Sequence, residues 1–243
     1  MRLDFIGVGF GRSGSNWLCN CLYEHPEISI PKFNLHTEIN YFPEEYEVMG
    51  LKNYIKKFKN CDFEKTVGEI STLIIFEKRS AKLLKKLFPN TKIIVYKRDE
   101  KERVRSSKDV ANYYDLVEDT SISKNPVTEI NQQEYIEPFI KEFGKKNVFI
   151  YDMEKSDRNK QKELNKLFKF LGVNEFTPPS INIRRNSGFT DKERKKVKGT
   201  KNPVMRKIIN FLKSKLKGNK KLYYTLKRNF HFDYIYQLIN HNL

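Results

Sequence analysis

The stretch FIGVGFGRSGSN, residues 5 to 16, joins an apolar run to a turn that contains three glycines and one arginine. Glycine adopts the backbone conformations that tight turns require, and it lets a ligand approach the main chain closely. The residues from Ser15 onward have the character of a helix start. The stretch therefore predicts a strand, a loop and a helix whose first N–H groups face an anion such as a phosphate.

Apolar, β-branched runs alternate with stretches of helical periodicity along the following residues. The predicted strands are residues 3–9, 65–71, 91–97 and 146–152, and the predicted helices are residues 15–25, 77–88, 100–114, 132–143 and 159–172. Strands separated by helices of this length predict a single α/β domain with a central parallel sheet flanked by helices. We assign residues 1–183 to this core and residues 184–243 to a basic, mainly helical extension, with an amphipathic helix from Pro203.

The glycine pattern fits two nucleotide-binding loops, but each lacks a group that it needs. The stretch Gly9–Gly14 matches the dinucleotide pattern G-x-G-x-x-G, yet the later segment EHPEISIPKFN has no acid after its apolar residues to bind a ribose. A Walker A loop requires Lys and then Ser or Thr where this chain has Ser15 and Asn16. The third interpretation is a metal-free anion site formed by the helix start together with Arg12, Ser13, Ser15 and Asn16.

A second basic motif follows a later predicted strand. The run IIVY leads to Arg98, and Ser106 lies eight positions further on, about two turns into the next predicted helix. Parallel strands end at one edge of a sheet, where open α/β folds bind ligands, so we expect both side chains to bind a second phosphate there. The alternative is a solvated surface helix rich in Lys, Arg and Glu.

At these residues the sequence resembles the sulfotransferases that use 3′-phosphoadenosine 5′-phosphosulfate (PAPS). Their 5′-phosphosulfate loop is similar to RSGSNWL at residues 12–18, in which Asn16 replaces the usual hydroxyl residue. Three further segments resemble the family: LYEHP at residues 22–26, GEIST at residues 68–72 and LFPNTK at residues 87–92.

The resemblance implies a fold like that of P-loop NTPases, no metal, PAPS as the sulfate donor and adenosine 3′,5′-bisphosphate (PAP) as the product. It implies a 3′-phosphate site at Arg98 and Ser106, and stabilisation of the leaving 5′-phosphate by Arg12. The residues that it places on the donor are Arg12, Ser13, Gly14, Ser15, Asn16, Trp17, Arg98 and Ser106.

The segment LHTEINYF, residues 35–42, holds two candidates for the catalytic base. Glycan-type sulfotransferases have a catalytic Glu shortly after the first helix, in a K-E-x-x-[FY]-F context, and Glu38 matches it although Thr37 replaces the Lys. The cytosolic small-molecule branch uses a His instead, which makes His36 the rival. The alternative for Glu38 is a solvated loop carboxylate.

Most of the net charge of +17 lies near the end of the chain, because residues 184–228 contain 17 Lys and Arg against 2 Asp and Glu. One interpretation is a solvated tail without a specific role. The sharper one is a surface for an anionic acceptor, such as a glycan or a lipid head group, or for a membrane. The resemblance adds a loop over the 3′-phosphate, with two alternatives: Arg184 and Arg185, or Lys198 and Gly199.

The cysteines and histidines show no metal-ligand spacing, and we expect the three thiols to be reduced. Without a recognisable secretory signal or membrane span, we expect a cytoplasmic protein that is peripheral at a membrane if the basic region binds one. The resemblance favours a sulfotransferase that acts on a hydroxyl or amine of a carbohydrate or glycolipid. The alternatives are a non-catalytic protein that binds adenine nucleotides or nucleic acid, and a dinucleotide oxidoreductase. We expect no nucleic-acid partner, because no recognition motif accompanies the charge.

Overall fold

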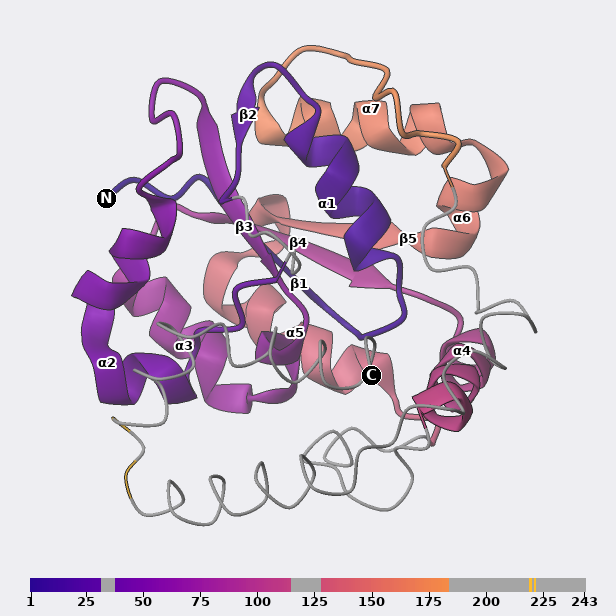
Figure 1. Ribbon diagram of the computed structural model, residues 1–243, viewed down its shortest axis with the longest axis horizontal. Helices are drawn as coiled ribbons and strands as arrows, with labels where there is room; N and C mark the ends of the chain where they lie inside the picture. Colours follow the sequence, from indigo (N-terminus) through magenta and orange to yellow (C-terminus); the bar gives the residue numbers. More distant parts are fainter. Residues whose placement is uncertain (32–37, 115–127, 184–218, 220, 222–243) are drawn as a thin grey trace, which may run out of the picture.

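The computed structural model describes residues 1–31, 38–114, 128–183, 219 and 221 of the 243-residue chain. Five parallel strands form one sheet in the order β2-β3-β1-β4-β5 (Figure 1). The strands are β1 (Phe5–Gly9), β2 (Ile28–Ser29), β3 (Thr66–Ser71), β4 (Lys92–Lys97) and β5 (Val148–Asp152). This confirms the predicted α/β class and the parallel sheet.

Helices pack against both faces of the sheet (Figure 1). The helices are α1 (Ser15–Tyr23), α2 (Glu44–Ile55), α3 (Lys78–Leu87), α4 (Glu100–Tyr114), α5 (Gln132–Phe143), α6 (Met153–Arg158) and α7 (Lys160–Leu171), and the short 3₁₀ turns are η1 (Lys56–Phe58), η2 (Leu73–Phe76) and η4 (Lys145–Asn147). The core on one face joins α2, α3 and α5, and the core on the other joins α1 and α7. No helix in the described ranges is long and apolar enough to cross a membrane.

Alternation along β1 shows how the strands supply both cores. Phe5 packs with Leu18 of α1 and Phe168 of α7, whereas the next residue, Ile6, packs with Leu84 of α3 and the helices beside it. Successive side chains of a strand point to opposite faces, so a strand buried on both faces needs an unbroken apolar run. The runs that predicted the strands are the consequence of this double burial.

The four strands and five helices predicted from the sequence are present, with ends that shift by up to two residues. Among the strands and α-helices of the described residues, three were not predicted: β2, α2 and α6. The strand β2 has only two residues, and α2 is interrupted at Gly50, where φ is 72°. The helix expected from Pro203 and the proposed extension 184–243 fall almost entirely outside the described residues.

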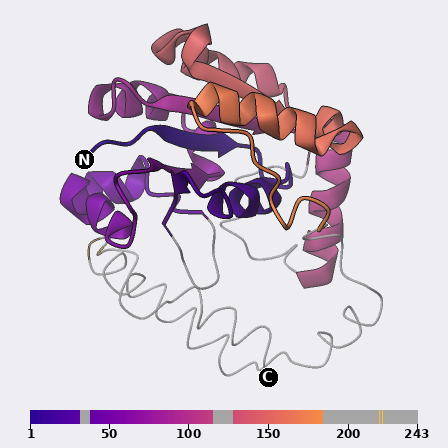
Figure 2. The ribbon, with the colours of Figure 1, turned by 90° about the horizontal axis from the view of Figure 1, so that it is seen from above.

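The carboxyl ends of the strands carry the segments that the motifs singled out. The loop after β1 leads into α1, the end of β4 leads to Arg98, and β5 runs directly into α6. The helix α4 lies beyond the strand ends in both views (Figures 1 and 2). The fold thus brings both sequence motifs to one edge of the sheet, as the parallel arrangement predicts.

Candidate active site

The loop between β1 and α1 depends on two of its glycines. A Cβ on Gly9 would lie 2.3 Å from the carbonyl oxygen of Tyr96, so the close approach of β1 to β4 excludes any side chain there. Gly14 has a φ of 82° and occupies the N-cap position of α1, where no side chain caps the helix. The first N–H groups of α1 are therefore available to an anion at the strand ends.

The two basic motifs meet at this loop. Arg12 donates through Nε to Ser106 Oγ at 3.1 Å, and Arg98 donates through Nη1 to the carbonyl oxygen of Arg12 at 3.3 Å. Arg98 also lies 3.6 Å from Glu102 and 3.7 Å from Glu154, and its side chain is only 16% exposed. Two arginines and a serine that are 86 and 94 residues apart in the chain thus form one polar cluster.

A cleft opens over this cluster at the start of α1. Seven of the residues predicted for donor binding line it, together with Met153 of α6: Arg12, Gly14, Ser15, Asn16, Trp17, Arg98 and Ser106. The indole of Trp17 is fixed because its Nε1 donates to the carbonyl oxygen of Ile181 at 3.1 Å. Met153 was not predicted as part of the site, because it is distant from both motifs in the sequence, at the start of α6 directly after β5.

The remaining predicted residues are placed differently. The side chain of Ser13 is 1% exposed and lies behind the lining of the cleft. Among the described residues, Ser13 Oγ and Arg98 Nε are buried without a hydrogen-bond partner. His36, Arg184, Arg185, Lys198 and Gly199 lie outside the described residues.

Glu38 stands beside the cleft, held from three sides. Its backbone forms an isolated bridge with Ile70 of β3, and its Oε1 accepts a hydrogen bond from Ser15 Oγ at 2.8 Å. Its Oε2 accepts from Asn40 Nδ2 at 3.1 Å and from Thr72 Oγ1. Ser15 lines the cleft, so its hydroxyl connects Glu38 to the anion site. The solvated loop carboxylate considered from the sequence would not have these contacts.

A second carboxylate, Glu69, lies in the core next to this segment. It is 1% exposed and accepts hydrogen bonds from Tyr54 Oη at 3.0 Å and from Ser71 Oγ at 2.8 Å. Burial raises the pKa of Glu69 to about 7, although hydrogen bonds from Ser71 and Tyr54 and the charge of Lys57 act in the opposite direction. In the sequence, Glu69 is the one charged residue of the strand TVGEIS and part of the family-like segment GEIST, but neither pattern gave it a role.

Glu69 makes the stability of the protein depend on pH. Because its pKa rises from 4.5 to about 7 on folding, the folded protein retains a proton that the unfolded chain releases. The retained proton adds about 3 kcal/mol to the free energy of unfolding. This contribution is fully present below pH 4.5 and is lost as the pH rises through about 7. Urea unfolding of wild type and Glu69→Gln across this range should show the decline in wild type alone. Parallel curves would mean that Glu69 titrates normally.

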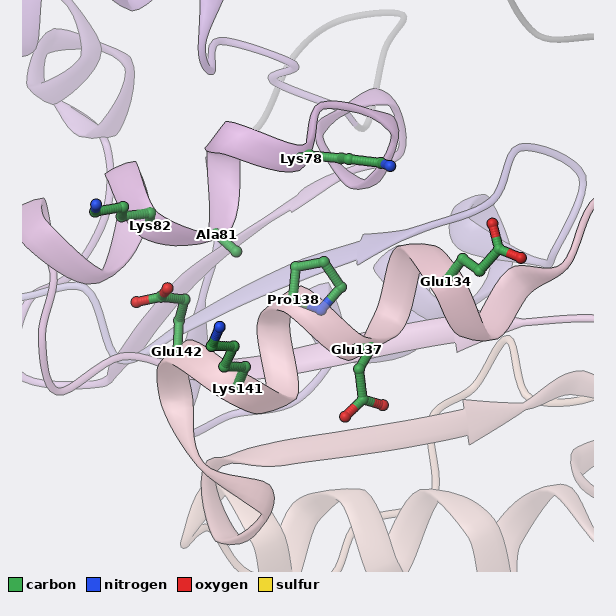
Figure 3. Close-up of a pocket in the computed structure, with 8 residues that line it drawn as sticks. All are labelled: Lys78, Ala81, Lys82, Glu134, Glu137, Pro138, Lys141 and Glu142. Carbon is green, nitrogen blue, oxygen red and sulfur yellow. The ribbon is translucent and has the colours of Figure 1, made fainter.

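A larger cavity lies elsewhere, between α3 and α5. It has a volume of about 330 Å³ and is lined by Lys78, Ala81, Lys82, Glu134, Glu137, Pro138, Lys141 and Glu142. Figure 3 shows these residues on the two helices: α3 contributes two lysines and Ala81, and α5 contributes three glutamates, Lys141 and Pro138. None of the predicted site residues that the structure describes borders it, so the smaller cleft at the strand ends is the candidate active site. Within the described ranges, no three His, Cys, Asp or Glu side chains are grouped to hold a metal ion.

Comparison with known proteins identifies the family of this arrangement. The family model described as "Sulfotransferase domain" matches residues 2–242. No individually curated protein gives a significant match. Among solved structures, the chain is similar to a sulfotransferase from Alicyclobacillus acidocaldarius, with 21% identity, a TM-score of 0.53, and coverage of 80% of this chain and 89% of that one.

Two further structures are similar. For the sulfotransferase domain from the curacin biosynthetic pathway, the identity is 17%, the TM-score 0.51, and the coverage 80% of this chain and 83% of that one. For mouse sulfotransferase SULT7A1 complexed with PAP, the identity is 19%, the TM-score 0.45, and the coverage 76% and 64%. The family model spans nearly the whole chain, and the fold agrees with it. The protein therefore belongs to the PAPS-dependent sulfotransferase family, as its loop and strand motifs predicted.

Proposed function

We propose that this protein transfers the sulfuryl group of PAPS to a hydroxyl or amine group of a carbohydrate or glycolipid, with Glu38 as the general base. The observation that carries the proposal is the link from the anion cleft to Glu38 through Ser15. A nucleotide-binding protein without catalysis would need the cleft but not a carboxylate hydrogen-bonded at its edge.

The residues at the cleft suit a donor with two phosphate groups. The N-terminus of α1 and Arg12 offer N–H groups and positive charge to one anion, and Arg98 and Ser106 lie beside them for another. Among the described residues, Arg98 Nε is buried without a hydrogen-bond partner, and a ligand oxygen is a suitable acceptor for it. Trp17 adds an aromatic face to the same lining.

Each residue then has a distinct part in the reaction. Bound PAPS supplies the sulfuryl group and leaves as PAP. Arg12 and the first N–H groups of α1 stabilise the charge that develops on the departing phosphate. Glu38 accepts the proton of the attacking group. Its carboxylate receives three hydrogen bonds and has about four lone-pair sites, so one site remains for that proton.

Two features support a carbohydrate or glycolipid acceptor. The Glu38 segment resembles the glycan-type sulfotransferases in the Tyr41-Phe42 pair that follows the acid. The sequence of residues 184–228 carries 17 basic against 2 acidic side chains, more than one donor molecule requires. An acceptor that is itself anionic accounts for this excess.

Incubation with radiolabelled PAPS and a panel of carbohydrates, glycolipids and phenols tests the proposal. We expect labelled carbohydrate or glycolipid, and weaker transfer at high salt where the acceptor is anionic. Labelled phenols alone would contradict the acceptor class. Absence of all transfer, together with thermal stabilisation by ATP or NADP but not by PAP, would contradict the donor as well.

A further inference from the structure

The carboxylate Glu69 does not line the cleft of the donor site, yet it is buried in the core, where an ionisable group is unfavourable. It lies on β3 with 1% of its surface exposed, among the apolar side chains of that face of the sheet. Burial of an ionisable group is unfavourable unless hydrogen bonds and charges compensate for the lost water. Tyr54, Ser71 and the nearby charge of Lys57 provide this compensation.

A chain of hydrogen bonds leads from Glu69 to Glu38. Ser71 donates through Oγ to Glu69 Oε2 at 2.8 Å, and the same Oγ accepts from the backbone N–H of Asn40 at 2.9 Å. Asn40 in turn donates through Nδ2 to Glu38 Oε2 at 3.1 Å. Two residues therefore connect the buried acid with the proposed base.

The direction of these bonds depends on Glu69. An ionised carboxylate only accepts hydrogen bonds, so the Ser71 hydroxyl must point its proton at Glu69 and present its lone pairs to Asn40. Asn40 has a φ of 45°, in the left-handed region, which asparagine enters more readily than most residues other than glycine. The hydrogen bond to Ser71 holds the backbone in this conformation and aims the Asn40 amide at Glu38.

We propose that Glu69 is a positioning residue for sulfuryl transfer, which orients the carboxylate of Glu38 through Ser71 and Asn40. The inference rests on the proposed role of Glu38 as the base. Glu69 itself touches neither donor nor acceptor, because its side chain is enclosed in the core. Its effect is therefore expected on kcat, while PAP affinity is set by the cleft residues.

A double-mutant cycle tests the connection. At pH 8, where the carboxylate form of Glu69 predominates given its pKa of about 7, Glu69→Gln and Ser71→Ala should each lower kcat by roughly tenfold, the effect of losing one charge-assisted hydrogen bond. Because both changes cut the same chain, the double variant should lose little more than either single one. The KM for donor and the affinity for PAP should stay within about twofold of wild type.

Thr91→Val serves as the matched control. Thr91 is 1% exposed and donates a buried hydrogen bond to the carbonyl oxygen of Leu3, before the start of β4 and away from Glu38. This variant loses a comparable interaction but should keep its kcat. An equal loss of kcat in Thr91→Val, or additive losses in the cycle, would overturn the positioning role. If Glu69→Gln does not fold, Glu69→Asp, which withdraws the carboxylate from Ser71, takes its place in the cycle with Ser71→Ala.

The turnover of Glu38→Gln distinguishes failure of the proposed base from failure of the positioning role. If Glu38→Gln is inactive while Glu69→Gln and Ser71→Ala turn over at the wild-type rate, the positioning role fails and the base remains. If Glu38→Gln keeps full turnover, the base assignment fails and the role of Glu69 fails with it.

Discussion

Replacement of Glu38 by glutamine is expected to lower kcat by about a hundredfold to ten-thousandfold, the range that a positioned general base supplies. Glutamine has nearly the shape of glutamate. With its amide oxygen in the place of Oε2 it can still accept hydrogen bonds from Asn40 and Thr72, and its amide N–H can donate to the hydroxyl of Ser15. It cannot take a proton from the acceptor. The variant should therefore keep the fold and the donor site and lose the chemical step.

Transfer assays and PAP titrations together measure this separation. Glu64→Gln is the control. It replaces a glutamate by a glutamine in the same way, but Glu64 is exposed and lies away from the site. PAP should stabilise wild type, Glu38→Gln and Glu64→Gln against thermal unfolding by similar amounts. Turnover close to wild type in Glu38→Gln would exclude Glu38 as the base and direct attention to His36.

The fold was largely predictable because its signals are local. Each buried strand is an apolar run, and the glycine loop between β1 and α1 is written in consecutive residues. The loop also predicts an anion site, because the first N–H groups of a helix and the neighbouring Arg12 both attract negative charge. These features need no knowledge of what packs where.

The pairing within the site could not be predicted in the same way. The spacing of Arg98 and Ser106 suggested that these two side chains act on one phosphate, but Ser106 hydrogen-bonds to Arg12 across 94 residues. Whether Ser106 contacts Arg12 or Arg98 depends on the angle between β4 and α4. No local sequence pattern determines this angle. The ion pair of Arg98 with Glu154 could not be predicted either, because Glu154 belongs to α6, which is distant from Arg98 in the sequence.

Glu69 shows a different limit of the sequence. Glutamate is depleted in strands and is almost never fully buried unless it is paired, so a glutamate in a strand normally predicts a side chain that faces solvent. Here Tyr54 from α2 and Ser71 from β3 supply the hydrogen bonds that allow it to be buried. Because α2 is interrupted at Gly50 and was not predicted, its tyrosine could not be assigned as a partner.

Arg98→Ala is expected to weaken PAP binding by at least about thirtyfold, as truncation of one partner in a buried charge contact commonly does. The side chain is 16% exposed, its Nε has no hydrogen-bond partner in the described part of the chain, and its Nη1 donates to the backbone carbonyl oxygen of Arg12. Its removal also leaves Glu102 and Glu154 at an anion site without the cation between them. The remaining carboxylates would then repel the ligand. Titration of PAP at constant ionic strength measures the loss, because such affinities depend on salt.

Comparison of two ligands shows which phosphate Arg98 binds. If it binds the 3′-phosphate, Arg98→Ala should lose affinity for PAP but little for adenosine 5′-monophosphate, which lacks that group. Arg98→Lys should fall between, because lysine keeps the charge without the fork of donors. Arg105→Ala is the control: Arg105 lies on α4, is 73% exposed and also pairs with Glu102, yet faces solvent. Equal losses for both ligands would mean that Arg98 contacts the 5′-phosphate beside Arg12, and would leave Ser106 as the predicted contact for the 3′-phosphate.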